Sequence, residues 1–186
     1  MNNIKEFITQ FEQLSKEEFD SLYKCLKKEH FKKGDFLIRE QQKSNHLYFL
    51  QEGSARAFFY KDGKEVTTWF AFENQTLTSY YSFITRTDSI ENIQFLEKSV
   101  LYSIHYDSLQ KLYKEFHGIE RLGRKITEFY YKWQEERIFS LQFHTAKERY
   151  QKLLIQEPHL SQKISLGHIA SYLGITQETL SRIRKM

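Results

Sequence analysis

The sequence has little of several residues that normally mark particular classes of protein. It contains one cysteine, Cys25, one proline and seven glycines among 186 residues. A single cysteine excludes an internal disulfide and argues against a cysteine-ligated iron-sulfur cluster or zinc ribbon, so we expect Cys25 to be a buried small hydrophobic side chain. No apolar run is long enough to span a bilayer, and the first ten residues, MNNIKEFITQ, lack the apolar block of a signal peptide. These absences predict a cytoplasmic protein with no membrane partner.

The chain also lacks the residue patterns of common catalytic and metal sites. No His-x-His pair, glycine-rich phosphate loop or G-x-S-x-G elbow occurs, and the seven histidines are scattered. We expect each histidine to be a surface or hydrogen-bonded residue and not a ligand. They are His30, His46, His105, His117, His144, His159 and His168. The sequence therefore predicts no enzyme, no catalytic residue, no metal site and no cofactor.

What the chain does have is enough apolar residues for a core and a local excess of positive charge. It is 40% apolar and 16% aromatic, which suffices for one domain or two small ones. The net charge is +4, and residues 144–186 alone hold seven Lys and Arg against three Glu. This placement favours attraction to phosphate, which would weaken as salt rises. The alternative is a solvated basic surface without a partner.

The periodicity of the apolar residues changes twice along the chain. Residues 1–31 have helical spacing, with Ser15 as an expected N-cap and Glu18 three residues on. Residues 32–106 alternate and contain turn signals, of which Asp62-Gly63 is the strongest. The strand candidates are 36–39, 47–50, 55–60, 65–72, 92–96 and 100–105. These short strands predict an antiparallel roll or small barrel.

Helical spacing returns at residues 107–141, and its longest run has an a/d pattern over about two heptads. We expect this stripe to form the seam of a homodimer; the alternative is that it packs against the chain's own roll. The stripe consists of Ile119, Leu122, Ile126, Phe129 and Trp133. A hinge at residues 143–146 follows, in which Thr145 is an expected N-cap for a helix over residues 146–156.

The most informative stretch is 164–186, which reads as two short helices with one break at Gly174. Gly174 can adopt the positive φ that a tight turn between helices needs, and Thr176 is an expected N-cap. On the second helix, Glu178 can accept from cytosine N4 and Arg182 can donate to guanine O6 and N7, and their spacing of four lets them orient each other. We predict a helix-turn-helix whose second helix enters the major groove. The alternative is that the two helices only close a small core.

The segment ITQETLSRIRK, residues 175–185, resembles the recognition helix of the cyclic-AMP receptor and fumarate-nitrate regulator (Crp/Fnr) family of bacterial transcription factors. The segments KKGDFLIRE and LYFLQEGSAR resemble the opening of the family's cyclic-nucleotide-binding roll. The resemblance implies contacts to bases and phosphate and a parallel homodimer through the long helix. The DNA-binding residues that we predict are Thr176, Gln177, Glu178, Ser181, Arg182, Arg184 and Lys185. Most family members continue beyond the recognition helix, so we expect either that this support is missing or that the sequence is truncated.

Family members that bind cyclic nucleotides carry Gly-Glu and then Arg-Ser or Arg-Thr in a phosphate-binding segment, and this chain has neither pair in the corresponding places. Burial of a cyclic phosphate without its cation would be costly, and only Arg86 lies close enough to substitute. The segment instead offers hydroxyl and aromatic side chains for a less charged ligand, unless its aromatic residues fill the roll. The candidate effector pocket consists of Thr78, Ser79, Tyr80, Tyr81, Arg86 and Ser89.

These observations predict an α+β fold. An antiparallel β-roll of the double-stranded β-helix type with flanking helices (residues 1–116) precedes a dimerisation helix (117–143) and an all-α helix-turn-helix domain (144–186). The predicted function is that of a homodimeric, sequence-specific regulator of transcription that binds double-stranded DNA and is controlled by a small-molecule effector other than cyclic AMP, or by none. The alternative is a dimeric sensor or interaction module whose helix-turn-helix no longer binds DNA. The sequence does not give the effector, the operator or the sign of regulation.

Overall fold

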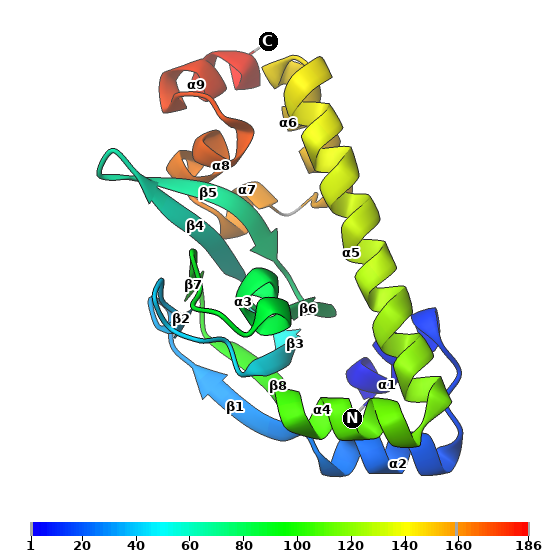
Figure 1. Cartoon of the computed structure of the whole chain (residues 1–186). Coiled ribbons are helices and arrows are strands. Elements are labelled where there is room, and N and C mark those ends of the chain that lie inside the picture. The colour runs from blue at the N-terminus through cyan, green and yellow to red at the C-terminus, as the bar shows by residue number, and fades with distance from the viewer. Residues whose placement is uncertain (1, 159, 186) are drawn as a thin grey trace.

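The structure is a computed structural model that describes residues 2–158 and 160–185. Met1, His159 and Met186 lie outside these residues, and with them the prediction that His159 is not a metal ligand. Figure 1 shows a β-roll with small helices at its base, a long helix that rises along one side, and a cluster of short helices at the far end of that helix. No helix of the described chain is both long and apolar enough to cross a membrane.

The roll is built from two four-stranded antiparallel sheets. One has the strand order β1-β8-β3-β6 and the other β2-β7-β4-β5. The strands are β1 (Lys27–Phe31), β2 (Phe36–Ile38), β3 (His46–Glu52), β4 (Ala55–Lys61), β5 (Lys64–Ala71), β6 (Gln75–Leu77), β7 (Asn92–Phe95) and β8 (Ser99–His105). Fully buried residues such as Leu50, Ala57 and Leu101 fill the space between the sheets. The predicted α+β fold with an antiparallel roll is confirmed.

The segment Lys27–Phe31 is a strand, so the prediction that it belongs to the N-terminal helical region is wrong. This segment pairs along its whole length with β8, from Lys27 opposite Ser103 to Phe31 opposite Ser99. Its side chains are exposed or only partly buried, so no alternation of apolar residues marks it. Hydrogen bonding to a neighbouring strand determines this edge strand, and the segment's own residues carry no sign of that neighbour.

The helices at the base of the roll are α1 (Asn2–Phe11), α2 (Lys16–Lys24) and α4 (Tyr106–Glu115), whereas the short helix α3 (Tyr80–Thr85) lies higher, near β6 (Figure 1). Ser15 caps α2 as predicted, in a capping box with Glu18. Cys25 follows α2 and is exposed, so its predicted burial is wrong. Burial was expected because a lone cysteine usually serves as a small hydrophobic side chain, but α2 ends at Lys24 and Cys25 lies exposed beyond it.

The long helix α5 (His117–Phe143) carries the five residues of the predicted seam. The first three are buried within the chain, and the last two are not. Ile119, Leu122 and Ile126 pack in a core with α1, α2, α4 and β3, where they are at most 8% exposed. The alternative that the stripe packs on its own roll therefore holds for these three residues, and the seam prediction is wrong for them. Phe129 is 52% exposed and Trp133 is partly buried.

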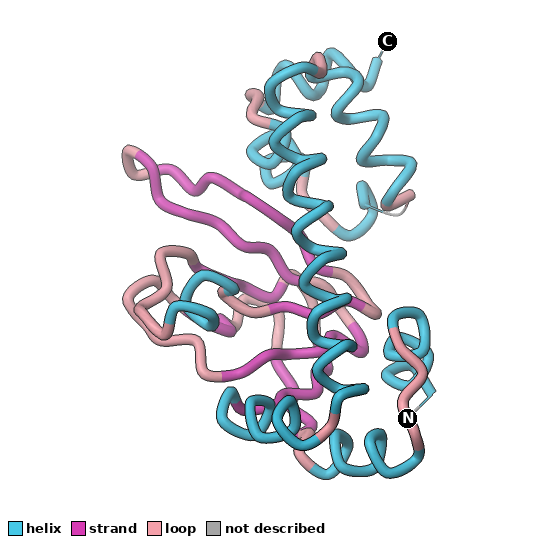
Figure 2. The backbone as a smooth tube through the Cα atoms, turned by 45° about the vertical axis from the view of Figure 1, so that its right-hand side comes forward, coloured by secondary structure: helices cyan, strands magenta, loops and turns pink. Residues whose placement is uncertain are grey.

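The C-terminal part of the chain forms four helices above the roll: α6 (Ala146–Gln156), α7 (Leu160–Lys163), α8 (Leu166–Leu173) and α9 (Gln177–Lys185). Thr145 caps α6 in a capping box with Glu148, as predicted. Ile169, Leu173 and Leu180 are fully buried in a core that also includes Phe70 of β5. Figure 2 shows this cluster beside the upper end of α5, with the β4-β5 hairpin reaching toward it.

Candidate DNA-binding interface and effector site

The turn between α8 and α9 has the geometry that the sequence predicts. Gly174 ends α8 in the left-handed region, with φ of 69° and ψ of 32°. The hydroxyl of Thr176 accepts from the backbone N–H of Thr179 at 3.2 Å, which is the bond of an N-cap. Leu173 and Leu180 on either side of the turn are fully buried against each other's helix. Two short helices therefore cross in a fixed arrangement.

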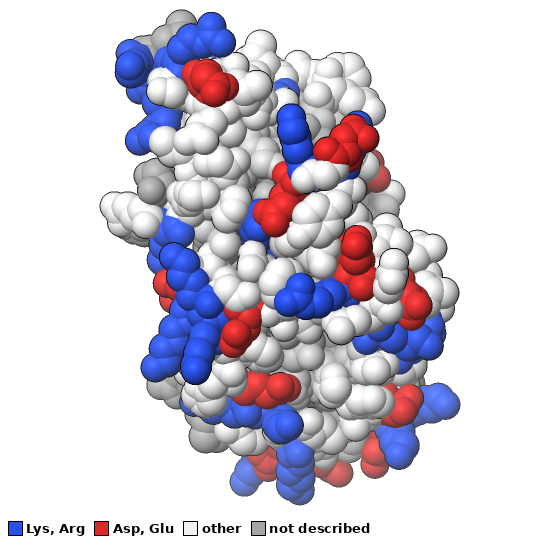
Figure 3. All heavy atoms as spheres, turned by 90° about the vertical axis from the view of Figure 1, so that its left-hand side faces the viewer, with Lys and Arg blue, Asp and Glu red and all other residues white. Residues whose placement is uncertain are grey.

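The predicted DNA-binding residues all lie exposed on or just before α9. Figure 3 shows Lys and Arg side chains gathered at the upper end of the molecule, where α9 ends, with little acidic surface beside them. Arg182, Arg184 and Lys185 occupy the last turn of this helix, where positive charge also complements the helix dipole. Together these residues give α9 a polar and largely basic outer face.

Glu178 and Arg182 do not orient each other as their spacing predicts. Arg182 donates to the hydroxyl of Thr179 at 3.4 Å, and no ion pair joins it to Glu178. The backbone N–H of Glu178 and the Thr176 hydroxyl hold the pKa of the Glu178 carboxyl below its usual range, with a smaller contribution from Arg182. The carboxylate is thus ionised and exposed, and both side chains are available to a ligand.

Two arginines that the sequence analysis missed hold α8 in place. Arg137 of α5 donates to the carbonyl of Tyr172 and lies over the Tyr172 ring, 3.8 Å from its centroid. Arg149 of α6 donates to the carbonyl of Leu173 at 2.8 Å and to that of His144 at 2.6 Å. Carbonyls at the C-terminal end of a helix lack partners within the helix, so these bonds satisfy them and place positive charge at the negative end of the dipole.

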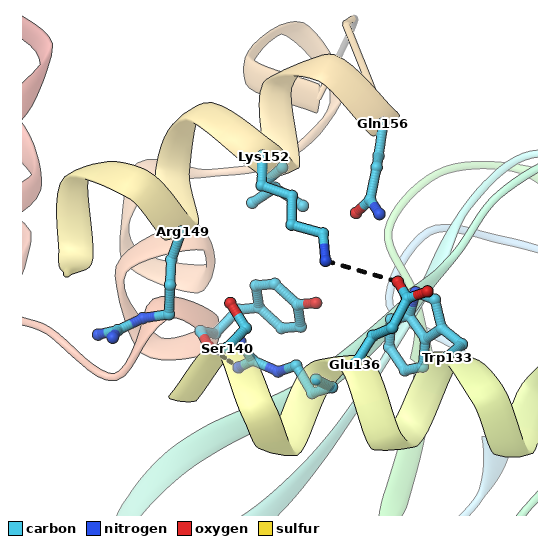
Figure 4. Close-up of a pocket in the computed structure, with 9 residues that line it drawn as sticks. Trp133, Glu136, Ser140, Arg149, Lys152 and Gln156 are labelled. Atoms are coloured by element: carbon cyan, nitrogen blue, oxygen red, sulfur yellow. Dashed lines mark hydrogen bonds and ion pairs between the residues drawn. The ribbon is translucent and has the colours of Figure 1, made fainter. Parts of the chain in front are cut away.

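Figure 4 shows the junction of α5 and α6, a small cavity of about 30 Å³. Lys152 reaches from α6 to Glu136 on α5 at 3.5 Å, and Trp133 and Gln156 lie beside this pair. Helical spacing alone could not have identified this junction, because its residues belong to helices whose relative placement depends on the whole fold.

The helix-turn-helix unit also contacts the roll. The Ser171 hydroxyl accepts from the backbone N–H of Thr67 at 2.9 Å and donates to the carbonyl of Glu65 at 3.1 Å. The rings of Phe70 and Tyr172 lie 5.3 Å apart. Strand β5 is therefore a second support for α8, in addition to the two arginines.

The candidate effector pocket is not formed as the sequence predicts. Thr78, Ser79 and Ser89 are fully or almost fully buried, and their hydroxyls bond within the fold. Thr78 bonds the Ser44 hydroxyl at 2.7 Å, and Ser89 bonds the Ser79 hydroxyl at 2.9 Å. These side chains close the segment internally and leave no free polar groups for a ligand.

Of the remaining candidates, Tyr80 lines two cavities that are described below. Tyr81 is 56% exposed on the outer side of α3. Arg86 donates to the Ser44 carbonyl at 2.9 Å and to the Asn45 side chain at 2.7 Å, and it lies over the Tyr106 ring. Its guanidinium secures the loop and is not free to bind a phosphate.

Two larger cavities lie between the roll and the helices. One of about 250 Å³ lies between α1, α4, α5 and β3 and is lined mainly by aliphatic and aromatic side chains. The other, of about 490 Å³, lies between β5, α5 and the helix-turn-helix unit. Neither has a Lys or Arg among its described lining residues. No group of three metal-ligating side chains occurs in residues 2–158 and 160–185.

A sensor-like roll, a long helix and a helix-turn-helix supported by both together define the class of two-part transcription regulators. Residues 28–116 match the family described as the cyclic nucleotide-binding domain. The transcriptional activator protein Anr of Pseudomonas aeruginosa is 25% identical, over 91% of this chain and 74% of that protein. These matches agree with the resemblance of the chain to the Crp/Fnr family of regulators.

Solved structures agree with this resemblance at the level of the fold. FixK2 from Bradyrhizobium japonicum superimposes with a TM-score of 0.74 at 19% identity, over 86% of this chain and 83% of that one. A transcriptional regulator of the Crp/Fnr family from Eubacterium rectale gives a TM-score of 0.71 at 18% identity, over 92% and 82% of the two chains.

Proposed function

We propose that this protein is a cytoplasmic, sequence-specific DNA-binding regulator of transcription that acts as a homodimer. The observation that supports this most directly is the outer face of α9. Gln177, Glu178, Ser181 and Arg182 are all exposed there, on a helix whose inner residue Leu180 is fully buried. A rigid helix with free carboxylate, amide and guanidinium groups suits base contacts in the major groove.

The proposed base reader is Arg182, and its replacement tests the proposal. On the duplex that the protein selects from a random pool, Arg182→Ala should cost roughly 1 to 3 kcal/mol and relax the preference at one base pair. Lys111→Ala removes one exposed positive charge from α4, at the opposite end of the molecule, and serves as the control. Fluorescence anisotropy with matched and single-base-substituted duplexes measures both effects. Equal losses for the two variants would contradict the proposal.

We place the dimer contact on a different face of α5 from the one that the sequence suggests. Its upper half exposes large apolar side chains, which soluble proteins rarely leave uncovered in a group. Three of these side chains are Tyr131, Ile138 and Leu141, which are 67%, 50% and 46% exposed. Together with Gln134 they form a stripe with spacings of three, four and three residues. This stripe satisfies the spacing of a two-helix seam. A dimer through it would present two α9 helices to two half-sites.

The second candidate function is a dimeric sensor or interaction module that does not bind DNA. The same exposed stripe on α5 would serve it, whereas the outer face of α9 would have no role. In that case Arg182→Ala would change neither the oligomeric state nor any DNA affinity.

Control by cyclic AMP is not part of the proposal. The Gly-Glu pair is missing from the sequence, and the guanidinium of Arg86, in the Arg86-Thr87 pair, is held by Ser44 and Asn45. A cavity without a cation would bury a cyclic phosphate at a large desolvation cost. An effector, if the protein uses one, has different chemistry.

A further inference from the structure

The larger cavity has an unusual lining for a site between a roll and a helix. Nine of its eighteen lining residues are aromatic, and they come from several parts of the molecule. Trp69 belongs to β5 and Phe72 follows it, Tyr130 and Trp133 belong to α5, and Tyr172 belongs to α8. A volume of about 490 Å³ is within the usual range for sites that bind small molecules.

The electrostatics of this cavity are one-sided. Glu157, which is half-buried at the end of α6, is the one charged residue among the described lining residues. Lys163 lies near it, but its ammonium group also approaches the carboxylates of Glu73 at 3.7 Å and Glu97 at 3.8 Å. Among the described lining residues the charge is therefore the single carboxylate of Glu157, which favours a cation. Arg137, Arg149 and Lys152 line the smaller cavity that shares Trp133, Leu153, Gln156 and Tyr172 with this one.

The indole rings strengthen this preference. The Trp69 N–H donates to the buried carboxyl of Glu91 at 3.1 Å, which fixes the ring in the cavity wall and adds electron density to it. The faces of Trp and Tyr rings attract cations, and indole does so most strongly. Aromatic faces beside a single carboxylate are the arrangement that recognises organic ammonium ions.

We infer that the groove lined by Trp69, Trp133, Tyr172 and Glu157 binds an organic cation, an ammonium group on an apolar or aromatic body. The ammonium group lies against the indole faces near Glu157, and the body fills the apolar remainder of the groove. As an effector site, the groove rests on the proposed regulatory function. Its lining includes Leu153 of α6 and Tyr172 of α8, and the Arg137 guanidinium lies over the Tyr172 ring, 3.8 Å from its centroid. A ligand there would contact the roll, α5 and the helix-turn-helix unit at once. It would also lie beside the proposed dimer seam, because Tyr131 and Gln134 belong to both the seam and the groove.

Tryptophan fluorescence tests this inference directly, because both tryptophans of the chain line the groove. We would titrate the full chain with 4-phenylbutyl-trimethylammonium, 4-phenylbutanol and 4-phenylbutyrate, which share one body and differ in charge. The cation should quench emission saturably and bind about tenfold tighter than the alcohol, and the carboxylate should not bind. Glu157→Gln and Trp133→Leu should each weaken the cation about tenfold. Glu115→Gln, an exposed carboxylate on α4, is the matched control and should change nothing.

Several outcomes would overturn the inference. They are equal quenching by the carboxylate and the cation, equal behaviour of Glu157→Gln and Glu115→Gln, and no saturable quenching by the cation up to about 10 mM. A change of emission with protein concentration, without any response to the cation, would show that a second copy of the chain covers the groove. Circular dichroism of each variant checks that it is folded.

The regulatory part of the inference has a separate readout. Saturating cation should change the affinity for the selected duplex severalfold in wild type and not in Trp133→Leu. If the cation binds and the DNA affinity is unchanged, the regulatory part fails while the binding site stands. If no duplex is selected at all, the proposed DNA-binding function fails, and the fluorescence result remains valid without it.

Discussion

At the scale of single residues, Glu91 is a buried carboxyl group that lowers the stability of the fold at neutral pH. It is 8% exposed, and burial raises its pKa from 4.5 to about 7, against smaller opposing contributions from Ser79 and Trp69. Between these two values the unfolded chain releases the proton and the folded chain keeps it. Folding free energy is therefore lost as pH rises from about 4.5 to about 7, and the full penalty remains above that range.

Glu91→Gln removes this penalty and keeps an oxygen that can accept from Trp69. We expect the variant to be more stable than wild type at pH 8, by at most about 3 kcal/mol, and of similar stability near pH 4.5. Urea denaturation at the two pH values measures the difference, with Glu115→Gln as a surface control. A variant that is destabilised equally at both pH values would show that the carboxyl group is not the source of the penalty.

Side chains that act on their own backbone could be predicted from the sequence, whereas those that act across the fold could not. Ser15 and Thr145 cap helices as expected, because a capping box needs only four consecutive residues. Arg137 and Arg149 bind carbonyls 35 and 24 residues away in the sequence. The exposure of Cys25 was not predicted either, because it depends on where α2 ends.

At the scale of elements, the turn between α8 and α9 depends on one glycine. A side chain at Gly174, with φ of +69°, would meet no atom within 4 Å but would be strained by the backbone. We expect Gly174→Ala to cost about 1 kcal/mol and Gly174→Asn to cost less, because Asn tolerates the left-handed region better.

Gly167, inside α8, is the matched control for this prediction. Its backbone is helical and a Cβ there would make ordinary contacts, at 3.7 Å from Gln177 and beyond. Gly167→Ala should therefore be neutral or stabilising by up to about 1 kcal/mol. Denaturant unfolding compares the two. If Ala at position 174 stabilised the protein as much as Ala at 167, the left-handed turn would not be required.

Elements with strong internal periodicity could be predicted well, and those defined by their neighbours could not. Strands β4 and β5 alternate around Asp62-Gly63 and form the expected hairpin. Strand β1 and the short helix α3 have no such pattern, since pairing with β8 and the closure of the roll determine them. The periodicity of α5 was correctly read as helical, but periodicity does not say whether a stripe faces the roll or a second chain.

At the scale of the whole molecule, the exposed stripe of α5 predicts the oligomeric state. Ile138→Glu would place a charge in the middle of the proposed seam, where a partner helix would bury it at a high cost. We expect the wild type to be a dimer at micromolar concentration and Ile138→Glu to be a monomer. Tyr60→Glu puts the same charge on another exposed side chain, at the β4-β5 hairpin, and should remain dimeric. Equilibrium sedimentation decides between these outcomes, and a monomeric wild type would contradict the dimer.

The charge distribution of the molecule predicts how DNA affinity depends on salt. The basic last turn of α9 suits phosphate contacts, each of which contributes about 0.9 to the negative slope of log K against log salt. Lys185→Ala should reduce the magnitude of this slope by about 1 and leave the sequence preference unchanged. Anisotropy titrations at several salt concentrations measure the slope. An unchanged slope would mean that Lys185 contacts no phosphate.

The central claim is that α9 reads a DNA sequence, and selection from a random duplex pool tests it most directly. Wild type, Arg182→Ala and Lys111→Ala would be compared at about physiological salt. We expect wild type and Lys111→Ala to enrich the same two-fold symmetric site, with half-sites about one helical turn apart, and Arg182→Ala to lose the preference at one position in each half. Enrichment of no sequence, with and without the phenylbutyl ammonium ion, would contradict the claim and favour the module that does not bind DNA.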